Sequence, residues 1–267
     1  MQVTFSSHQG RILGALDIGK YQQDALANQK PTAATLVRAK NGYSVNVMVD
    51  AQVPDAQGNK TLGVDLGIRN VAVLSSGRKW GGSKIREYRE KQWKSRASLQ
   101  SHGTRGARRL LRRLSGKEAR HGAWINHRIA KAIVAEAVKV SASLIRMEDL
   151  RGIRDRLKIP NKHRNRMVSL WSFAQLQTFV EYKAALCGIR LERINPAYTS
   201  QTCHQCKKHG LRDRETFCCT PCGLTIDADV NAAKVIAAGG VEPGDIPGDR
   251  NATQIASQIV EFFSHSA

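Results

Sequence analysis

Two closely spaced cysteine pairs constrain this chain more than any other feature of its sequence. Cys203 and Cys206 form one C-x-x-C pair, and Cys219 and Cys222 form a second pair shortly after it. Each C-x-x-C turn directs two sulfurs at one ion, so two such turns supply the four ligands of a tetrahedral zinc site. A closed shell of four thiolates leaves no position open for a substrate. We therefore expect a structural zinc in a small ribbon over residues 199–223.

Neighbouring cysteines and histidines leave alternatives for the ligand set. Cys218 competes with Cys219, but a ligand at Cys218 would break the C-x-x-C spacing, so Cys219 is preferred. His204 and His209 are possible substitutes that a four-cysteine site does not need. Cys187 lies at the end of a predicted helix and is interpreted as an apolar filler.

The charge balance points to a polyanionic partner. The chain has 42 Lys and Arg against 22 Asp and Glu, which gives a net charge of +20. Nucleic acid is the first candidate because Lys and Arg displace counterions from phosphates, and an anionic membrane is the alternative on charge alone. The sequence has neither a secretory signal pattern nor an apolar run of the ~20 residues that a membrane span needs. We expect no membrane partner, and metal-bound cysteines in a reducing cytoplasm or a nucleoid within it.

The first 58 residues are predicted to form a small β unit. Ala33–Arg38 and Tyr43–Ala51 are rich in β-branched residues and flank a Lys-Asn-Gly turn, which predicts a hairpin. The polar segment 19–28 is predicted to be a short helix or a loop. A Pro/Gly/Asn-containing segment at 53–59 marks a boundary. The unit is too small for a good core of its own.

Three acidic residues lie at the ends of predicted elements that are far apart in the sequence. Asp65 and Glu148 each end a strand, and Asp229 starts a helix directly after the cysteine pairs. Carboxylates are the hard ligands that Mg²⁺ prefers, and two ions about 4 Å apart can cleave a phosphodiester by activating a water and stabilising the leaving oxygen. The spacing alone only suggests such a site, because Asp65 in its Asp-x-Gly turn is also typical of an aspartate that caps its own backbone.

A strongly basic helical region follows the first of these strands. Residues 83–139 carry apolar residues at helical spacing and predict at least two helices, with interruptions at 103–106 and at Ser115–Gly116. The basic residues lack the acidic partners at i+4 that a merely solvated face usually has. We therefore predict a surface that follows phosphates, made of Arg105, Arg108, Arg109, Arg112, Arg113, Lys117 and Arg120.

The remaining segments alternate between helix and strand. Residues 170–186 predict an amphipathic helix, closed by Cys187-Gly188. The basic segment 151–167 predicts a lid or a nucleic-acid contact, and residues 241–267 predict a flexible tail that ends in a short helix. Strands are predicted at 61–65, 71–74, 143–149 and 189–194.

Four ordered motifs resemble the TnpB family, the OrfB-type accessory proteins of bacterial insertion sequences and relatives of type V CRISPR effectors. GVDLGIRNVAV at 63–73, IRMEDL at 145–150 and DADVNAAKVIA at 227–237 look like the three split RuvC motifs of that family. The two cysteine pairs look like its zinc ribbon, inserted between the second and third motifs. The resemblance covers roughly residues 30 to 240.

This resemblance implies an α/β fold with an RNase H-like (RuvC) mixed sheet flanked by helices. The implied nuclease domain comprises residues 59–198 and 224–240, with the zinc ribbon inserted at 199–223. Residues 1–58 would be part of a wedge-like β unit, and 241–267 the flexible C-terminal tail.

The implied activity is RNA-guided, divalent-metal-dependent cleavage of DNA in a prokaryotic cell. Asp65, Glu148 and Asp229 would be the catalytic acids and would bind two Mg²⁺ ions, with a guide RNA and a DNA target as partners. Asp227 is interpreted as a neighbour of the site, and Asn231 in the same helix could orient it.

The sequence departs from the family pattern before Asp65, where family members usually carry a longer part that holds the guide RNA. We therefore expect a natural short form, a truncated element, or a chain that works as a homodimer or with a separate N-terminal component. The alternative function is a non-cleaving nucleic-acid-binding remnant or repressor. A plain zinc-ribbon DNA-binding factor is a third class, but it would need neither Asp65 nor Glu148 at a strand end.

Overall fold

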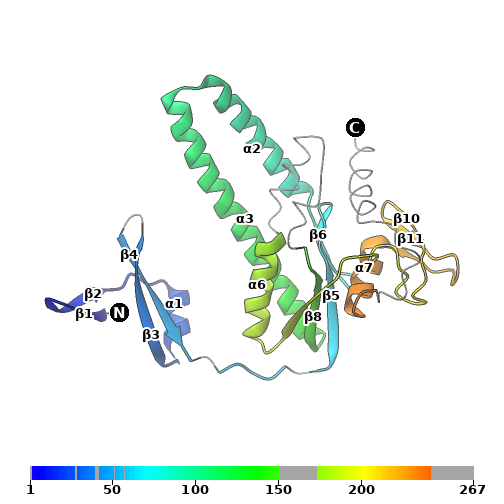
Figure 1. The fold of residues 1–267 in the computed structure, drawn as a ribbon, viewed down its shortest axis with the longest axis horizontal. Helices are drawn as coiled ribbons and strands as arrows, with labels where there is room; N and C mark the ends of the chain where they lie inside the picture. The colour runs from blue at the N-terminus through cyan, green and yellow to red at the C-terminus, as the bar shows by residue number, and fades with distance from the viewer. Residues whose placement is uncertain are drawn as a thin grey trace. The chain divides into compact units, whose positions relative to one another are not determined.

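The computed structural model describes residues 2–27, 29–39, 42–50, 52–56, 58–150 and 173–241 (Figure 1). Contacts divide the chain into one unit over residues 1–53 and a second over 54–267, and each is described by itself. The predicted lid at 151–167 and residues 242–267 of the predicted tail lie outside the described residues. The domain boundaries predicted from the sequence remain predictions.

The N-terminal unit consists of two hairpins joined by a helix. Strands β1 (Gln2–Ser7) and β2 (Gly10–Ala15) pair antiparallel, helix α1 (Lys20–Ala27) follows, and β3 (Pro31–Ala39) pairs antiparallel with β4 (Gly42–Val49). The hairpin predicted around the Lys-Asn-Gly turn is confirmed. None of the residues described in this unit is buried. Backbone pairing rather than a hydrophobic core therefore holds its strands in register.

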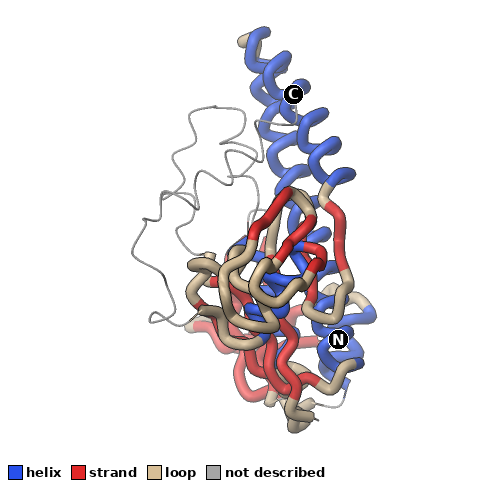
Figure 2. The backbone as a smooth tube through the Cα atoms, turned by 90° about the vertical axis from the view of Figure 1, so that its right-hand side faces the viewer, coloured by secondary structure: helices blue, strands red, loops and turns tan. Residues whose placement is uncertain are grey.

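The second unit is built on a mixed five-stranded sheet with the order β7-β6-β5-β8-β9. Figure 2 shows the strands of the protein in red and the helices in blue. Strand β5 pairs antiparallel with β6, and β6 pairs antiparallel with β7, whereas β5, β8 and β9 run parallel. All four strands predicted for this region are present, and only the short β7 was not predicted. The bounds are β5 Lys60–Asp65, β6 Asn70–Leu74, β7 Lys79–Gly81, β8 Ala142–Glu148 and β9 Arg190–Ile194.

Helices cover both faces of this sheet. Helices α3 (Arg105–Lys139) and α6 (Phe173–Ala185) pack on one face, and α7 (Ala228–Ala237) packs against β5 on the other (Figure 1). The residues of strand β5 contact both helical layers, because successive side chains of a strand point to opposite faces of the sheet. Leu62 and Val64 are buried in the core shared with α3 and α6, while the intervening Gly63 faces α7.

The close approach of α7 to the sheet depends on Gly63. A Cβ atom at this position would lie 1.9 Å from the carbonyl oxygen of Ala233 and 2.5 Å from the backbone nitrogen of Ala237. No side chain fits in that space, so only glycine lets the helix backbone rest directly on the strand. Gly63 thus places α7 close to the strand that ends in Asp65.

A long helical hairpin leaves the sheet between β7 and β8. Helix α2 (Ser83–His102) ends at Gly103, whose φ of 61° is left-handed, and the Thr104 side chain caps α3 by accepting a hydrogen bond from the Ala107 N–H at 3.1 Å. The interruption predicted at 103–106 is confirmed. The interruption predicted at Ser115–Gly116 is wrong, because α3 runs through it. An interior glycine costs only about 1 kcal/mol relative to alanine, which a helix packed elsewhere along its length tolerates.

The segment with the cysteine pairs folds as a small three-stranded antiparallel sheet between β9 and α7. Its strands are β10 (Leu211–Asp213), β11 (Thr216–Cys218) and β12 (Thr225–Asp227), in that order. Phe217 is fully buried at the centre of this ribbon and packs with Ala228 at the start of α7. The ribbon therefore continues directly into the helix that carries Asp229.

Candidate active site and cysteine cluster

Asp65 and Glu148 lie at the same edge of the central sheet. Strands β5 and β8 are parallel neighbours in which Val64 is paired with Met147, so the next residue of each strand is an acid. The carboxyl ends of adjacent parallel strands meet at one edge, which is where ligands bind in many α/β sheets. Glu148 is buried, with 8% of its surface exposed, and Asp65 is half-buried.

Asp229 reaches this edge from the first turn of α7. Asp227 caps the helix by accepting a hydrogen bond from the Val230 N–H at 3.0 Å. Asn70, at the start of β6, donates a hydrogen bond to Oδ2 of Asp229 at 2.8 Å. The helix start and the sheet edge are therefore joined at Asp229 itself.

Mutual electrostatic effects show that the three acids share one site. Burial raises the pKa of Asp65 well above its ordinary value, and the charges of Glu148 and Asp229 raise it further. Burial also raises the pKa of Glu148 to about 7, although a hydrogen bond from Thr199 and the charge of Arg212 oppose this rise. Without a cation, the cluster therefore retains protons near neutral pH.

Two buried side chains hold Glu148 in place. The Thr199 hydroxyl donates a hydrogen bond to Oε1 of Glu148, and the Gln177 amide donates one to the Glu148 backbone carbonyl at 2.5 Å. Each of the two is only 2% exposed. Buried polar groups matched in this way fix the orientation of the carboxylate. Sequence reasoning missed both residues, because no local pattern connects α6 or the Thr199 loop with Glu148.

Arg212 brings a positive charge from the cysteine ribbon into the acid cluster. Its guanidinium lies 2.6 Å from Oδ1 of Asp229, and its charge lowers the pKa of both Asp65 and Glu148 against the effect of burial. Sequence reasoning missed Arg212 because the ribbon was interpreted as scaffolding alone. The available signal was its position between the two cysteine pairs, on the segment that leads into the helix that carries Asp229.

Asp227 lies beside the cluster rather than at its centre. Its Oδ2 forms an ion pair with Nζ of Lys79 at 2.5 Å while its Oδ1 caps α7. Burial alone would raise the pKa of Asp227, but Lys79 and the Val230 N–H outweigh it and hold the pKa below its ordinary value. Asp227 is thus a charged capping residue, in keeping with its interpretation as a neighbour.

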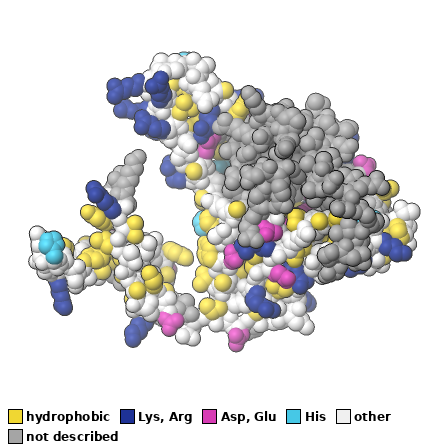
Figure 3. Space-filling model, in the orientation of Figure 1, with side chains coloured by type: hydrophobic (Ala, Val, Ile, Leu, Met, Phe, Trp, Pro, Cys, Tyr) yellow, Lys and Arg dark blue, Asp and Glu magenta, His cyan; other side chains and the backbone are white. Residues whose placement is uncertain are grey.

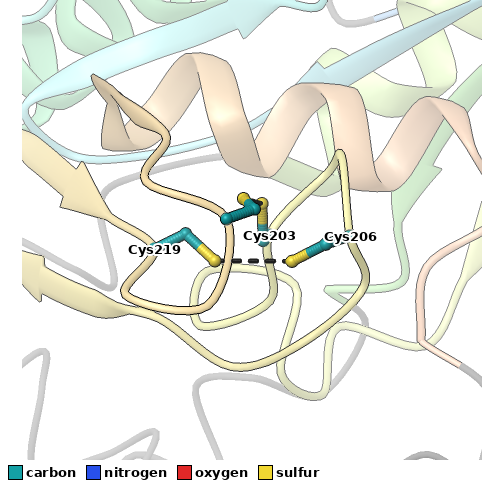
Figure 4. Close-up of side chains that lie close together, drawn as sticks. Cys203, Cys206 and Cys219 are labelled. Carbon is teal, nitrogen blue, oxygen red and sulfur yellow. Dashed lines mark hydrogen bonds between the residues drawn. The ribbon is translucent and has the colours of Figure 1, made fainter.

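The four predicted cysteine ligands form one compact group, of which Figure 4 labels Cys203, Cys206 and Cys219. The Sγ atoms of Cys203, Cys206, Cys219 and Cys222 all lie within 4.8 Å of one another. Two of the separations are 3.7 Å, for Cys203–Cys222, and 3.4 Å, for Cys206–Cys219. A tetrahedral ion with Zn–S bonds of ~2.3 Å requires sulfurs about 3.8 Å apart, so the cluster has the dimensions of a zinc site.

The proton affinities of these thiols also suit a cation. A backbone hydrogen bond from Lys208 lowers the pKa of Cys206 to about 7, whereas burial is the main cause that raises the pKa of Cys219 to about 12. A bound divalent cation deprotonates coordinating thiols outright, so it would remove this difference in proton binding between Cys206 and Cys219. Cys218 is exposed and lies outside the group, with its Sγ 3.8 Å from the Thr225 hydroxyl.

The other candidate ligands have different surroundings. His204 packs against α7, where its Nδ1 lies 3.0 Å from Oδ1 of Asn231, and the His209 ring contacts Tyr198 edge-on. Neither histidine belongs to the metal-ligand group found among the described residues. Cys187 follows α6 and packs, partly buried, against the main hydrophobic core.

All seven predicted nucleic-acid contacts lie on the N-terminal half of α3, and all are exposed. Figure 3 shows Lys and Arg side chains gathered at the outer end of the α2–α3 hairpin. The deeper half of α3 is different, since Ile129, Ile133 and Val134 are buried in the core. Helices in the described part of the chain are all too short or too polar to cross a membrane. Binding of nucleic acid by these seven residues remains a prediction.

Two family models match the chain. The model of the Cas12f1-like TNB domain matches residues 173–236, and the OrfB_IS605 model, described as a probable transposase, matches residues 44–154. A CRISPR-associated endodeoxyribonuclease Cas12f1 of Sulfoacidibacillus thermotolerans is 32% identical over 74% of this chain and 50% of its own length. A TnpB-like protein of Methanocaldococcus jannaschii is 36% identical over 46% of this chain and 44% of its own.

A solved structure agrees with these matches at the level of the fold. The cryo-EM structure of a Cas12f1–sgRNA–target DNA complex superposes with a TM-score of 0.55 and 20% identity, over 76% of this chain and 55% of that chain. The chain is thus related to CRISPR-associated and transposon-associated proteins. It is a homologue of Cas12f and of the TnpB-like proteins, and the resemblance predicted from its motifs is confirmed. The chain spans about half the length of these curated relatives.

Proposed function

We propose that this protein is an RNA-guided DNA endonuclease of an insertion sequence, which depends on divalent metal ions and acts in the nucleoid of a prokaryotic cell. The observation that carries the proposal is the meeting of Asp65, Glu148 and Asp229 at one sheet edge, where burial and mutual repulsion raise the pKa of the first two. A protein that only binds nucleic acid has no need to bring these charges together. Strongly perturbed acids of this kind cluster at functional sites.

The order and direction of the strands support an RNase H-like assignment. Three antiparallel strands continue into two parallel ones, with helices on both faces, as the family resemblance implies. The ribbon between β9 and α7 corresponds to the inserted zinc ribbon of that family. Its four sulfurs would hold zinc in a closed shell, which makes this metal structural.

The three acids offer oxygen ligands that suit Mg²⁺, which requires hard donors and keeps part of its water shell. Two Mg²⁺ ions bound there would activate the attacking water and stabilise the leaving oxygen of the phosphodiester. To bind them, Asp65 and Glu148 must first release the protons that the cation-free cluster retains.

The residues around the acids have separable tasks in this mechanism. Thr199 and Gln177 fix Glu148, and Asn70 fixes Asp229, so the carboxylates are oriented before the ions arrive. Arg212 balances the negative charge of the acids through its ion pair with Asp229. If bound ions neutralised that charge instead, the donors of its guanidinium would be available for a phosphate oxygen of the substrate.

The proposed partners follow from the relatives and from the charge of the chain. The related Cas12f1 structure is a complex with a single guide RNA and target DNA. A net charge of +20 and the basic half of α3 provide the electrostatic attraction that such partners require. In this proposal, base pairing with a guide selects the target while the protein contacts the nucleic-acid backbone.

The decisive experiment purifies the chain with its host RNA, sequences that RNA, and offers duplex DNA that matches it in the presence of Mg²⁺. We expect cleavage of the matching duplex and not of a scrambled one. Asp65→Ala should keep the bound RNA and lose cleavage. Cleavage that persists in Asp65→Ala would refute the site. Binding without cleavage in the unaltered chain would favour the non-cleaving repressor or remnant instead.

A second experiment tests the basic face of α3. Charge reversal by Arg112→Glu and Arg113→Glu should weaken binding to unrelated sequences alike. It should also reduce the salt dependence of binding, by about one in log–log slope for each phosphate that the protein no longer neutralises. Lys131→Glu on the same helix is the matched control, since Lys131 is exposed but lies beyond the basic half. Equal effects for each reversed charge in the control and in the test pair would show that only net charge matters.

A further inference from the structure

Asn231 is a completely buried polar residue that bridges the cysteine cluster and the acid-bearing helix. It lies on α7 two residues after Asp229, and 0% of its surface is exposed. Its Oδ1 accepts a hydrogen bond from the His204 backbone N–H at 3.1 Å, and its Nδ2 donates one to the Thr202 carbonyl at 2.7 Å. The two backbone groups flank Cys203. The side-chain amide of Asn231 therefore binds the backbone on both sides of Cys203.

The loop that Asn231 holds is closed by the cysteine cluster. The Cys203 backbone N–H donates a hydrogen bond to the Lys208 carbonyl at 2.9 Å, and the Lys207 N–H donates one to the Cys203 carbonyl at 3.0 Å. These bonds wind the loop so that Cys203 and Cys206 face the other two sulfurs. A bound ion would tie this loop to the second cysteine pair, in addition to the packing of Cys203 with Phe217 and Cys219. Its shape, and hence the position of the groups that Asn231 contacts, depends on the metal.

The two halves of α7 are held by different parts of the protein. Its later half rests on Gly63 of β5 through Ala233 and Ala237, as described above. Its first turn is held from two sides. On the ribbon side, the Ala228 N–H donates a hydrogen bond to the Glu215 carbonyl at 2.8 Å and Arg212 pairs with Asp229. On the sheet side, Asn70 of β6 bonds Asp229 and Lys79 of β7 pairs with Asp227. Asn231 lies between these halves. The sheet alone supports the later half of the helix, whereas the sheet and the ribbon together fix how the first turn presents Asp229.

We propose that Asn231 is a positioning residue that makes zinc retention by the four cysteines and divalent-ion binding at the acid cluster depend on each other. The acid-cluster half of this inference rests on the proposed function. Loss of zinc would free the loop around Cys203, leave the Asn231 amide without its partners, and loosen the turn that carries Asp229. By thermodynamic reciprocity, a divalent ion bound at the acids would slow the loss of zinc by the same coupling.

The test compares Asn231→Leu with Asn126→Ala in the full chain. Asn126 is a matched control because it is also a buried helical asparagine, and its side-chain amide donates a hydrogen bond to Gln175 on α6. Zinc release is followed with a colorimetric chelator, and binding of Mn²⁺ to the zinc-loaded protein is followed by titration. We expect Asn231→Leu to release zinc about tenfold faster and to bind Mn²⁺ about tenfold more weakly, the usual size of such outer-sphere effects. Asn126→Ala should match the wild type in both.

Hydrogen exchange separates this inference from the proposed function. Zinc removal from the wild type should speed exchange of the Ala228 and Val230 amides at least about tenfold, because the bonds that protect them depend on the ribbon and on the first turn. If the wild type binds no Mn²⁺, the proposed function fails, while exchange together with zinc release still decides whether zinc in the ribbon orders the first turn of α7. Unchanged exchange after zinc removal would overturn it, as would equal zinc release from both variants. Should Asn231→Leu fail to fold, Asn231→Asp, which keeps the acceptor and loses the donor to Thr202, takes its place.

Discussion

The cysteine cluster and the acid cluster share the short stretch from Cys203 to Asp229, but they are assembled in different ways. All four sulfurs come from this stretch, and each pair is brought together by a local turn. The acids come from β5, β8 and α7, so only the finished sheet brings them together. A local site can form as soon as its ion is present. A site assembled from distant elements must wait for the whole fold.

The largest difference between the two clusters is expected when one acid is neutralised, because this should affect cleavage and not zinc content. Asp229→Asn keeps the shape of the side chain but removes its charge, so we expect cleavage to fall by about 10³-fold or more. Zinc content should stay at one ion per chain, because the substitution leaves the sulfurs untouched. Asp213→Asn, at an exposed position of β10, should cleave at the wild-type rate. A parallel loss of zinc in Asp229→Asn would mean that the two clusters are one structural unit.

A converse experiment removes one sulfur. Cys219→Ser takes a buried ligand from the cluster, and we expect zinc content to fall from one ion per chain to about zero, with the ribbon unfolding locally. Cys218→Ser changes an exposed thiol next to it and should keep the zinc. Metal analysis of the two purified variants, together with proteolysis within the ribbon, measures the difference. Zinc loss from Cys218→Ser instead would reverse the assigned ligand register.

The acid cluster should also give the metal-free protein an unusual response to pH. The pKa of Glu148 is raised from 4.5 to about 7 in the folded state, so the folded protein holds this proton more tightly than the unfolded chain does. The stability that this proton contributes is present below pH 4.5 and is lost as the pH rises to about 7, on the order of 3 kcal/mol for this group.

Denaturant titrations between pH 5 and 8 measure this effect, and Glu148→Gln should flatten the profile. Mg²⁺ should restore stability at pH 8 and have little effect at pH 5, because protons compete with it for the carboxylates. A metal-free protein that gains stability over this range, in the manner of an ordinary paired carboxylate, would contradict the raised pKa of Glu148.

The contrast between the clusters also explains how much could be predicted from the sequence. The cysteine ligands follow from spacing alone, and the strands that end in Asp65 and Glu148 follow from hydrophobic runs interrupted by an acid. That these acids meet was suggested by spacing and implied by the family motifs, since no local pattern specifies which strands are neighbours. The catalytic roles of the three acids remain predictions.

The residues that were missed are those whose role depends on distant partners. Arg212, Thr199 and Gln177 lie on a hairpin, a loop and a helix that have no sequence relation to the acids they contact. The continuous course of α3 through Ser115–Gly116 was missed for the opposite reason, because a local signal was given too much weight. A small local penalty is easily outweighed by the rest of a 35-residue helix.

The distance between α7 and β5, and with it the spacing of the acids, depends on the absence of a side chain at Gly63. A methyl group there would meet the Ala233 carbonyl at 1.9 Å, so Gly63→Ala would have to lift α7 from β5 by about 1 Å or more before the chain could close. Asp65 lies two residues further along that strand, and Asp229 lies one helical turn before Ala233. A displacement of about 1 Å can cost 10²-fold in rate even when every reacting group is present. If the three acids are catalytic, as proposed, a homologue that keeps them but has a larger residue at this position should cleave about 10²-fold more slowly.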